Sequence, residues 1–282
     1  MDIDDVLSDW AYSPSDLMTR LVRASDGRYV LQMRIDMGLM QMEVKYRPDG
    51  TTPFGFKTYL AYLKHLAAKM KGCFVLESEY IDEAIRELKQ FNNRRICWLR
   101  LQRYSAVIRD ADHCISLMNF IQHRLDSQSP VVFTEMDRIL VLLHRTQAAT
   151  MVVLREHGPL QAIEEVASGI RRMMELSVVS SENTVITEEV NEQIEPILGE
   201  LLNLKQWIQD HYGLAPSLDE RLQNAVIDEK YELAAELRDL IGRYKKGGKY
   251  QDSSAIGGGM TVREENANKL ERETKIYRKR GE

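Results

Sequence analysis

The chain has 282 residues, with 38 lysines and arginines against 43 aspartates and glutamates, so its formal net charge is −5. Hydrophobic residues make up 44% of the chain and charged residues 29%, which is ordinary for a globular protein. A weakly acidic chain is not built as a general nucleic-acid binder. Seven prolines and 16 glycines exclude a collagen-like or broadly disordered chain. The length fits one large domain or two to three small ones.

Cysteine usage and the first residues indicate the compartment. Cys73, Cys97 and Cys114 are too few for a secreted disulfide framework and too far apart for paired metal ligands. Residues 1–10 are acidic and lack the basic start and apolar run of a signal peptide. The most apolar window, 139–154, is too short to span a bilayer. We therefore expect a cytoplasmic protein with reduced thiols and no membrane contact.

The N-terminal third alternates between apolar and polar positions, which is typical of strands with one buried face. The alternation predicts an antiparallel meander of three strands, near residues 17–24, 28–35 and 39–46. The expected turns contain glycines at positions 27, 38 and 50, which can supply a positive φ. An apolar stripe at helical spacing in residues 56–70 predicts the helix that covers this sheet. The first domain is therefore expected to span residues 1–76.

From residue 78 the apolar period becomes helical, and a shift of 55 residues aligns two similar segments. Each segment has a long helix, a short break and a second helix, with the breaks at 102–103 and 157–159. The pattern predicts two helical hairpins within residues 77–177. Small residues stand where the paired helices would cross, at Ala106, Ala111, Ala162 and Gly169.

The first break, Trp98 to Tyr104 followed by Val107, Ile108 and Ala111, resembles the turn region of a tetratricopeptide repeat. The resemblance implies a concave surface for a peptide or a partner. Gln102 stands where that repeat has a glycine, and the spacing is 55 residues instead of 34. A plain α-helical bundle explains the same pattern, so both interpretations stay open.

Several arginines lie close together in the first hairpin, at 94, 95, 100, 103 and 109. Arg94, Arg95 and Arg103 are candidates for a nucleic-acid contact, and the alternative is a solvated helix face with salt bridges. No H-E-x-x-H, G-x-S-x-G or phosphate-binding glycine motif occurs in the chain. We therefore expect no catalytic residues, no metal site and no cofactor.

The C-terminal third should begin with a connector at residues 177–190 and a helix at 192–211. Pro196 fits the first turn of that helix. Residues 218–244 then form two apolar helical stripes around a corner at Asp228–Lys230, which predicts a short antiparallel hairpin. A unit of this size cannot bury a sufficient core alone, so its apolar stripe requires a second helical hairpin from this chain or another.

The hairpin sequence closely resembles the UVR motif shared by the B and C subunits of the bacterial excision-repair nuclease. Similar hairpins occur in Clp-type ATPases and in activators of a bacterial protein arginine kinase. The resemblance implies that the hairpin, residues 215–245 within a domain of 190–245, is a protein-docking device. The residues expected to form it are Leu222, Ala225, Val226, Glu229, Tyr231, Glu232, Ala234, Ala235, Arg238, Asp239 and Ile241. Tyr231 would be the aromatic anchor, and Arg238 with Asp239 a polar latch.

The sequence therefore predicts an α+β protein, mainly α, with an N-terminal sheet, helical hairpins, a UVR hairpin and a flexible charged tail at 246–282. We expect a non-enzymatic bacterial adaptor that binds a complementary helical hairpin on another protein or a second copy of itself. Two alternatives are an accessory factor of nucleotide-excision repair with nucleic-acid contact and a regulator of a kinase or Clp-type protease. The helicase motifs, the nuclease domain and the Cys-x-x-Cys pairs of those relatives are missing, so their activities do not carry over.

Overall fold

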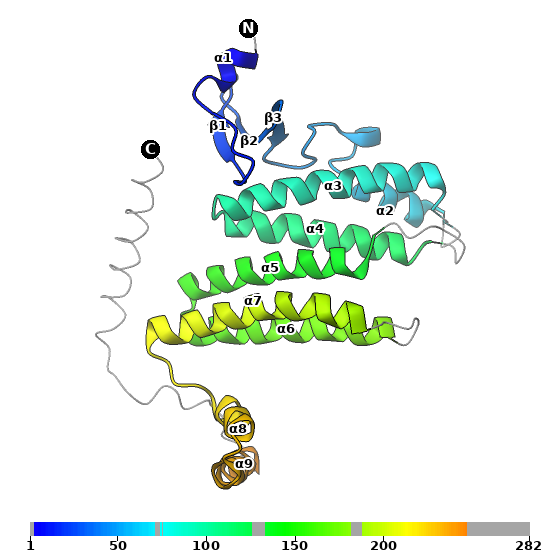
Figure 1. The fold of residues 1–282 in the computed structure, drawn as a ribbon. Coiled ribbons are helices and arrows are strands. Elements are labelled where there is room, and N and C mark those ends of the chain that lie inside the picture. The colour runs from blue at the N-terminus through cyan, green and yellow to red at the C-terminus, as the bar shows by residue number, and fades with distance from the viewer. Residues whose placement is uncertain (1–2, 71–73, 75, 126–132, 182–187, 247–282) are drawn as a thin grey trace. The chain divides into compact units, whose positions relative to one another are not determined.

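A computed structural model describes residues 3–70, 74, 76–125, 133–181 and 188–246 of the chain (Figure 1). The chain divides into two compact units, residues 1–206 and 207–282. We call the first the body, and we call residues 217–246 of the second the hairpin. The predicted tail lies outside the described residues except for its first position.

The predicted three-stranded sheet is confirmed. After a short helix α1 (Ile3–Leu7), strands β1 (Thr19–Arg23), β2 (Tyr29–Ile35) and β3 (Gly38–Glu43) pair antiparallel in the order β1-β2-β3. Leu31 faces Leu21 on one side and Met42 on the other, and Leu31 and Met42 are buried. Gly27 and Gly50 have the expected positive φ, whereas Gly38 opens strand β3 instead.

The sheet is covered by a different helix from the one expected. Leu31 and Met42 pack in one core with Cys97, Trp98 and Val107, which belong to the first helical hairpin. Helix α2 (Tyr59–Lys69) instead joins a separate core on that hairpin. The first helical hairpin of the body, within residues 78–122, therefore supports both the sheet and α2, so residues 1–76 do not enclose a core of their own.

Five long helices follow (Figure 1). The first four lie side by side in chain order, and the fifth packs against the third and the fourth. The five helices are α3 (Ser78–Arg100), α4 (Tyr104–Gln122), α5 (Glu135–Glu156), α6 (Pro159–Ser181) and α7 (Glu188–Tyr212), the last of which continues past residue 206. The segment at 177–190 is therefore not a connector throughout, because α6 runs to Ser181 and α7 starts at Glu188. Residues 182–187 are outside the described residues.

Helix α7 includes Pro196 in its interior, although the sequence suggested that the helix starts there. Proline removes one backbone hydrogen bond from a helix interior. Ile194 and Ile197, on either side of it, are buried against residues of α5 and α6, including Ile139 and Met173. This apolar packing offsets the lost hydrogen bond and keeps the helix continuous.

The two hairpins related by the 55-residue shift are present as α3–α4 and α5–α6. Gln102 has a φ of 54°, the left-handed conformation that glycine favours, and the Arg103 amide donates to the Trp98 carbonyl at 2.9 Å. In the second hairpin, Gly158 has a φ of 98°. A helix end that needs a left-handed residue therefore occurs in both copies.

The α5–α6 crossing depends on a glycine, as the small residues suggested. A Cβ atom added to Gly169 would lie 2.2 Å from a methyl carbon of Thr146. Gly169 therefore lets the backbone of α6 approach the side chains of α5 more closely than any other residue would. Ala111 and Ala162 are also fully buried in their hairpins.

Candidate functional site

Backbone and side-chain caps fix the hairpin, which consists of α8 (Leu218–Ile227) and α9 (Tyr231–Lys246). Ser217 and Glu220 form a reciprocal capping box, in which the Ser217 amide donates to the Glu220 carboxylate at 2.8 Å and the Glu220 amide donates to the Ser217 hydroxyl at 3.2 Å. At the corner, the Lys230 amide donates to the Ala225 carbonyl at 2.8 Å, and Glu229 has a φ of 57°. These bonds end α8 and reverse the chain at the predicted position.

The inner face of the hairpin is small and aliphatic, and Ile241 of α9 is also buried. Ala225, Ala234 and Leu237 form its core, and Leu218 and Leu222 pack against them. Ala234 and Leu237 are three residues apart on α9, so they lie on one side of the helix. The two alanines have no bulk beyond Cβ, which lets α8 and α9 lie close together.

The outer face carries Val226 and Tyr231, which the sequence placed in the apolar stripes, and also Ile227. Val226 is 50% exposed, Ile227 is 77% exposed and Tyr231 is 66% exposed. We call these three residues at the corner the hairpin tip. Val226 and Tyr231 therefore lie outside the core of the hairpin. A small two-helix unit has too little inner surface to bury all of its apolar residues.

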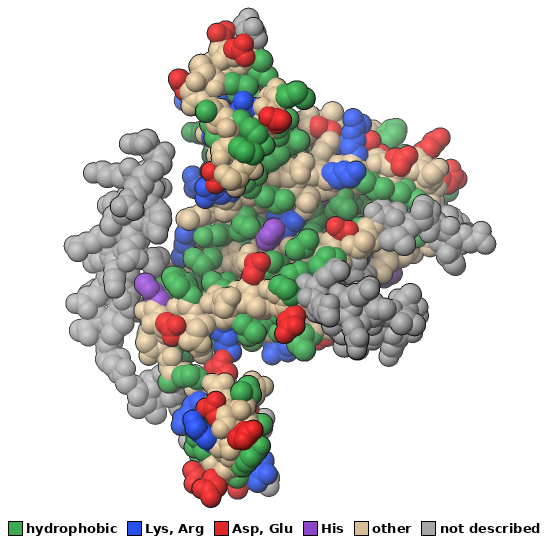
Figure 2. Space-filling view, viewed as in Figure 1, with side chains coloured by type: hydrophobic (Ala, Val, Ile, Leu, Met, Phe, Trp, Pro, Cys, Tyr) green, Lys and Arg blue, Asp and Glu red, His purple; other side chains and the backbone are tan. Residues whose placement is uncertain are grey.

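Polar residues of the motif also face outward. Arg238 and Asp239 are exposed and form an ion pair of 3.1 Å. Glu229, Glu232 and Ala235 are exposed as well. Figure 2 shows acidic and basic side chains close to hydrophobic ones on the hairpin. The described outer face therefore combines an apolar tip with charges of both signs.

A family-model comparison bears directly on this hairpin. Residues 214–247 match the model described as "UvrB/uvrC motif". The chain carries a UVR motif. No curated protein and no solved structure matched the chain. The matched range contains α8, the corner and α9, so the resemblance noted from the sequence is confirmed for this segment alone. UVR motifs are associated with protein and DNA interaction in the excision-nuclease and Clp-related proteins.

The arginines proposed to contact nucleic acid are separated by the fold. The Arg94 side chain is 1% exposed and makes two hydrogen bonds to Asp110, at 2.7 and 2.9 Å. It also donates to the carbonyls of Glu43 and Tyr46 and so ties β3 to α3. Arg95 is buried too, and only Arg103 of the three is exposed. Arg94 and Arg95 therefore cannot form a basic outer face, which corrects that expectation.

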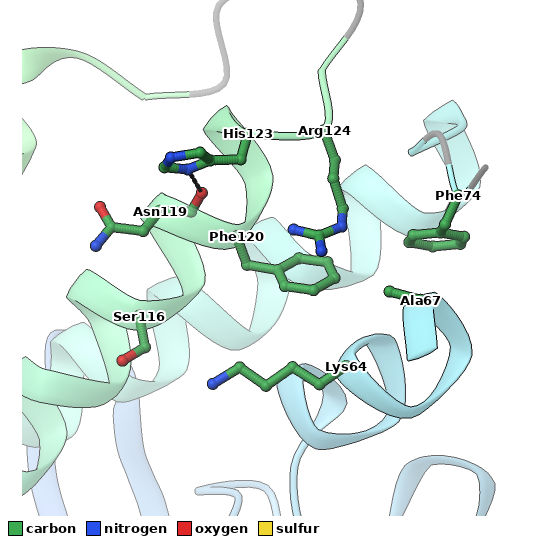
Figure 3. Close-up of a pocket in the computed structure, with 8 residues that line it drawn as sticks. All are labelled: Lys64, Ala67, Phe74, Ser116, Asn119, Phe120, His123 and Arg124. Atoms are coloured by element: carbon green, nitrogen blue, oxygen red, sulfur yellow. Dashed lines mark hydrogen bonds between the residues drawn. The ribbon is translucent and has the colours of Figure 1, made fainter. Parts of the chain in front are cut away.

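A hollow of about 470 Å³ lies between α2 and the end of α4 (Figure 3). The Arg124 guanidinium lies 3.9 Å from the centre of the Phe120 ring, and His123 donates from Nδ1 to the Asn119 carbonyl at 2.6 Å. Both side chains stand at the carboxyl end of α4, where the helix dipole favours positive charge. Stabilisation of that helix end accounts for them without a ligand.

The described residues show neither a metal-binding cluster nor a membrane-spanning helix. Within the described ranges, no three histidine, cysteine, aspartate or glutamate side chains are grouped so that they could hold a metal ion. Of the helices that the structure describes, none has the length and apolar character needed to cross a membrane. Among the described residues, the hairpin is therefore the candidate functional site, and no metal centre stands beside it as a second one.

Proposed function

We propose that this chain is a non-enzymatic cytoplasmic adaptor that docks a partner protein through its UVR hairpin. The exposed hairpin tip is the observation that supports this proposal. Isolated exposed apolar residues are common, but here Val226, Ile227 and Tyr231 come together at one corner of a motif associated with macromolecular interaction. Burial of each aliphatic side chain in a complex would contribute about 1.5–3 kcal/mol.

The proposed partner is a complementary helical hairpin, on another protein or on a second copy of this chain. A hairpin of α8 and α9 presents an apolar strip bounded by charges, and a second hairpin of the same kind can cover that strip. Tyr231 would be the anchor, because an aromatic ring buries a large area with few rotatable bonds. The exposed charges of Arg238 and Asp239 would pair with opposite charges of the partner and so favour one alignment of the two hairpins.

The arginine cluster gives little support to a nucleic-acid contact as the main function. Arg94 and Arg95 are engaged inside the body, and the hairpin from 218 to 244 has seven acidic residues against four basic ones. Phosphate backbones are bound by exposed, clustered cations. The balance of charge on the hairpin favours a protein surface.

The proposal is tested by quantitative affinity purification of the full chain and of Tyr231→Ala. Because the Tyr231 ring is exposed, Tyr231→Ala should leave the hairpin folded and its helical content unchanged. The proteins recovered with the unchanged chain should be depleted at least tenfold with Tyr231→Ala. Glu236→Ala is the matched control, because this exposed residue lies on another side of α9. Equal recovery of the same proteins by Tyr231→Ala, Glu236→Ala and the unchanged chain would contradict the docking role.

Self-association is measured separately by sedimentation velocity over a range of concentrations. If the partner is a second copy, the unchanged chain should dimerise and Tyr231→Ala should remain monomeric. Concentration-independent sedimentation of the unchanged chain would exclude this form of the proposal and leave a different protein as the partner.

A further inference from the structure

Arg95 lies inside the body without an ion-pair partner among the described residues. It is 2% exposed, and it donates to the Leu140 carbonyl at 3.1 Å, to His144 Nδ1 at 2.7 Å and to the Asn92 side chain. Its Nε has no hydrogen-bond partner. Asp110 is close enough to act on Arg95 electrostatically, but Arg94 and Arg109 already pair with that carboxylate. This part of the body therefore has a surplus of positive charge.

The contact with Arg95 determines how His144 is protonated. A guanidinium group can only donate, so Nδ1 of His144 accepts and the ring proton is on Nε2. Burial, together with the charge of Arg95, lowers the pKa of His144 to about 4. The ring is therefore neutral at pH 7 and offers an Nε2–H donor that the adjacent cation polarises.

His144 lines a hollow of about 470 Å³ between α3 and α5. Aliphatic side chains, among them Ile96, Leu99 and Met151, form its walls. Arg100 and Gln102 add polar groups, and none of the described residues that line it is acidic. The hollow combines apolar contact with a fixed hydrogen-bond donor.

The rim of the hollow is also basic. Arg100 and Arg103 are exposed, and neither makes an ion pair with a described carboxylate. Arg103 lines a neighbouring hollow of about 340 Å³, where Arg155 lies over the Tyr104 ring at 5.1 Å. Two carboxylates are also present, because Glu156 lines that neighbouring hollow and Glu200 accepts from Gln147 at 3.1 Å. Arg100 and His144 are therefore the lining groups of the hollow between α3 and α5 that favour an anion.

We propose that the hollow between α3 and α5 binds a peptide segment of a partner protein that carries a carboxylate next to an aliphatic side chain. The carboxylate accepts from His144 Nε2–H and balances Arg95, and the aliphatic side chain contacts Leu99 and Met151. The aliphatic walls favour a peptide over nucleic acid, because a nucleotide has no aliphatic side chain to contact Leu99 and Met151. This second site adds to the proposed adaptor and does not depend on the hairpin.

The test begins with a random dodecapeptide display library selected on the full chain. Enriched peptides are synthesised with a fluorophore, and their affinity is measured by anisotropy. We expect Asp, Glu or a free terminal carboxylate beside Leu, Ile, Val or Met. Replacing the acid by its amide should weaken binding at least tenfold, because a charge-assisted hydrogen bond is lost. Side-chain amidation and C-terminal amidation, made separately, distinguish the two sources of the carboxylate.

Variants of the chain locate the binding site. His144→Phe keeps the ring volume and removes the donor, so peptide affinity should fall at least tenfold, whereas His157→Phe at an exposed position should have no effect. Because His144→Phe also affects buried Arg95, a rim variant provides a second test. Gln102→Glu should weaken acidic peptides severalfold by repulsion, and Gln102→Asn, which suits the left-handed backbone there, should not. Thermal unfolding verifies that each variant is folded.

Three results would overturn the proposal. The first is that selection yields no binders, or yields binders without a carboxylate. The second is that neither His144→Phe nor Gln102→Glu changes the affinity of the selected peptides. The third is that a single-stranded oligonucleotide displaces those peptides and depends on His144 in the same way, which would assign the hollow to nucleic acid. Tyr231→Ala should bind the peptides normally, so failure here is distinct from failure of the hairpin.

Discussion

Arg94 in the body is buried, although arginine side chains are mostly exposed. Tyr231 in the hairpin is exposed, although its ring is largely apolar. Arg94 is buried, and four hydrogen bonds to Asp110, Glu43 and Tyr46 satisfy it within the chain. The ring of Tyr231 is 66% exposed at the corner of a small unit. The difference shows two uses of an unusual position. The buried Arg94 connects β3 and α4 to α3 within the body, whereas the exposed Tyr231 ring of the hairpin is available to contact another molecule.

Removal of Asp110 should give the largest effect. Asp110→Ala leaves Arg94 buried without its carboxylate, which should lower the free energy of unfolding of the body by about 3–5 kcal/mol. The matched control is Asp112→Ala, whose exposed ion pair with Arg145 should contribute less than about 1 kcal/mol. Urea unfolding of the full chain measures both. Equal losses for the two variants would mean that burial does not distinguish these pairs.

Truncation of the hairpin core should give an intermediate effect confined to that unit. Leu237→Ala truncates a buried leucine that packs with Ala225 and Ala234 and should destabilise the hairpin by about 2–5 kcal/mol. Hydrogen exchange should therefore accelerate in α8 and α9 and remain unchanged in α3 and α4. Faster exchange throughout the body would show that the two units do not unfold independently.

The state of His144 predicts how the body responds to acid. The folded-state pKa of about 4 is below the value of about 6.5 for an unperturbed histidine, so the unfolded chain binds the proton more readily. The contribution of His144 to stability is therefore complete above pH 6.5 and is lost as the pH falls toward 4. Nitrogen-15 NMR should show the Nε2–H tautomer at pH 7. A titration midpoint near 6.5 would contradict the buried contact with Arg95.

The smallest expected effects concern the two left-handed residues that end α3 and α8. Gln102→Gly in the body and Glu229→Gly in the hairpin should each raise stability by about 0.5–1 kcal/mol, because glycine adopts a positive φ without steric cost. Alanine at either position keeps the strain and should give no gain. Thermal unfolding of the four variants measures the difference. A loss of stability in both glycine variants would mean that these corners are not left-handed in solution.

Local patterns in the sequence were enough to predict the strands, the paired helices and the corner of the hairpin. They also contained an unused signal for the buried arginines. Phe91, Arg94, Arg95 and Trp98 recur at the spacing of one helix face, and all four are buried. Because arginine is charged, Arg94 and Arg95 were expected at the protein surface. Their acceptors, Asp110 on α4 and His144 on α5, come together only through tertiary packing.

In the hairpin, local patterns fail to show which apolar residue stays exposed. Helical spacing placed Ala234, Leu237 and Tyr231 in the apolar stripes, but it did not show which of them the hairpin itself buries. The stripe is wider than the surface that a second short helix can cover, so the tyrosine is left exposed. The support of the sheet by α3 and α4 instead of α2 was also beyond local patterns, because it depends on contacts between segments far apart in the sequence, such as Leu31 with Trp98 and Val107.

Site-specific photocrosslinking in living cells tests the docking role most directly. A photoreactive amino acid replaces Tyr231 or, as the control, Glu236 in the full chain. The account predicts a discrete covalent adduct with another polypeptide, or with a second copy of this chain, from position 231 and none from position 236. Absence of an adduct from position 231, or the same adducts from both positions, would contradict the central claim that the exposed hairpin tip is a docking surface.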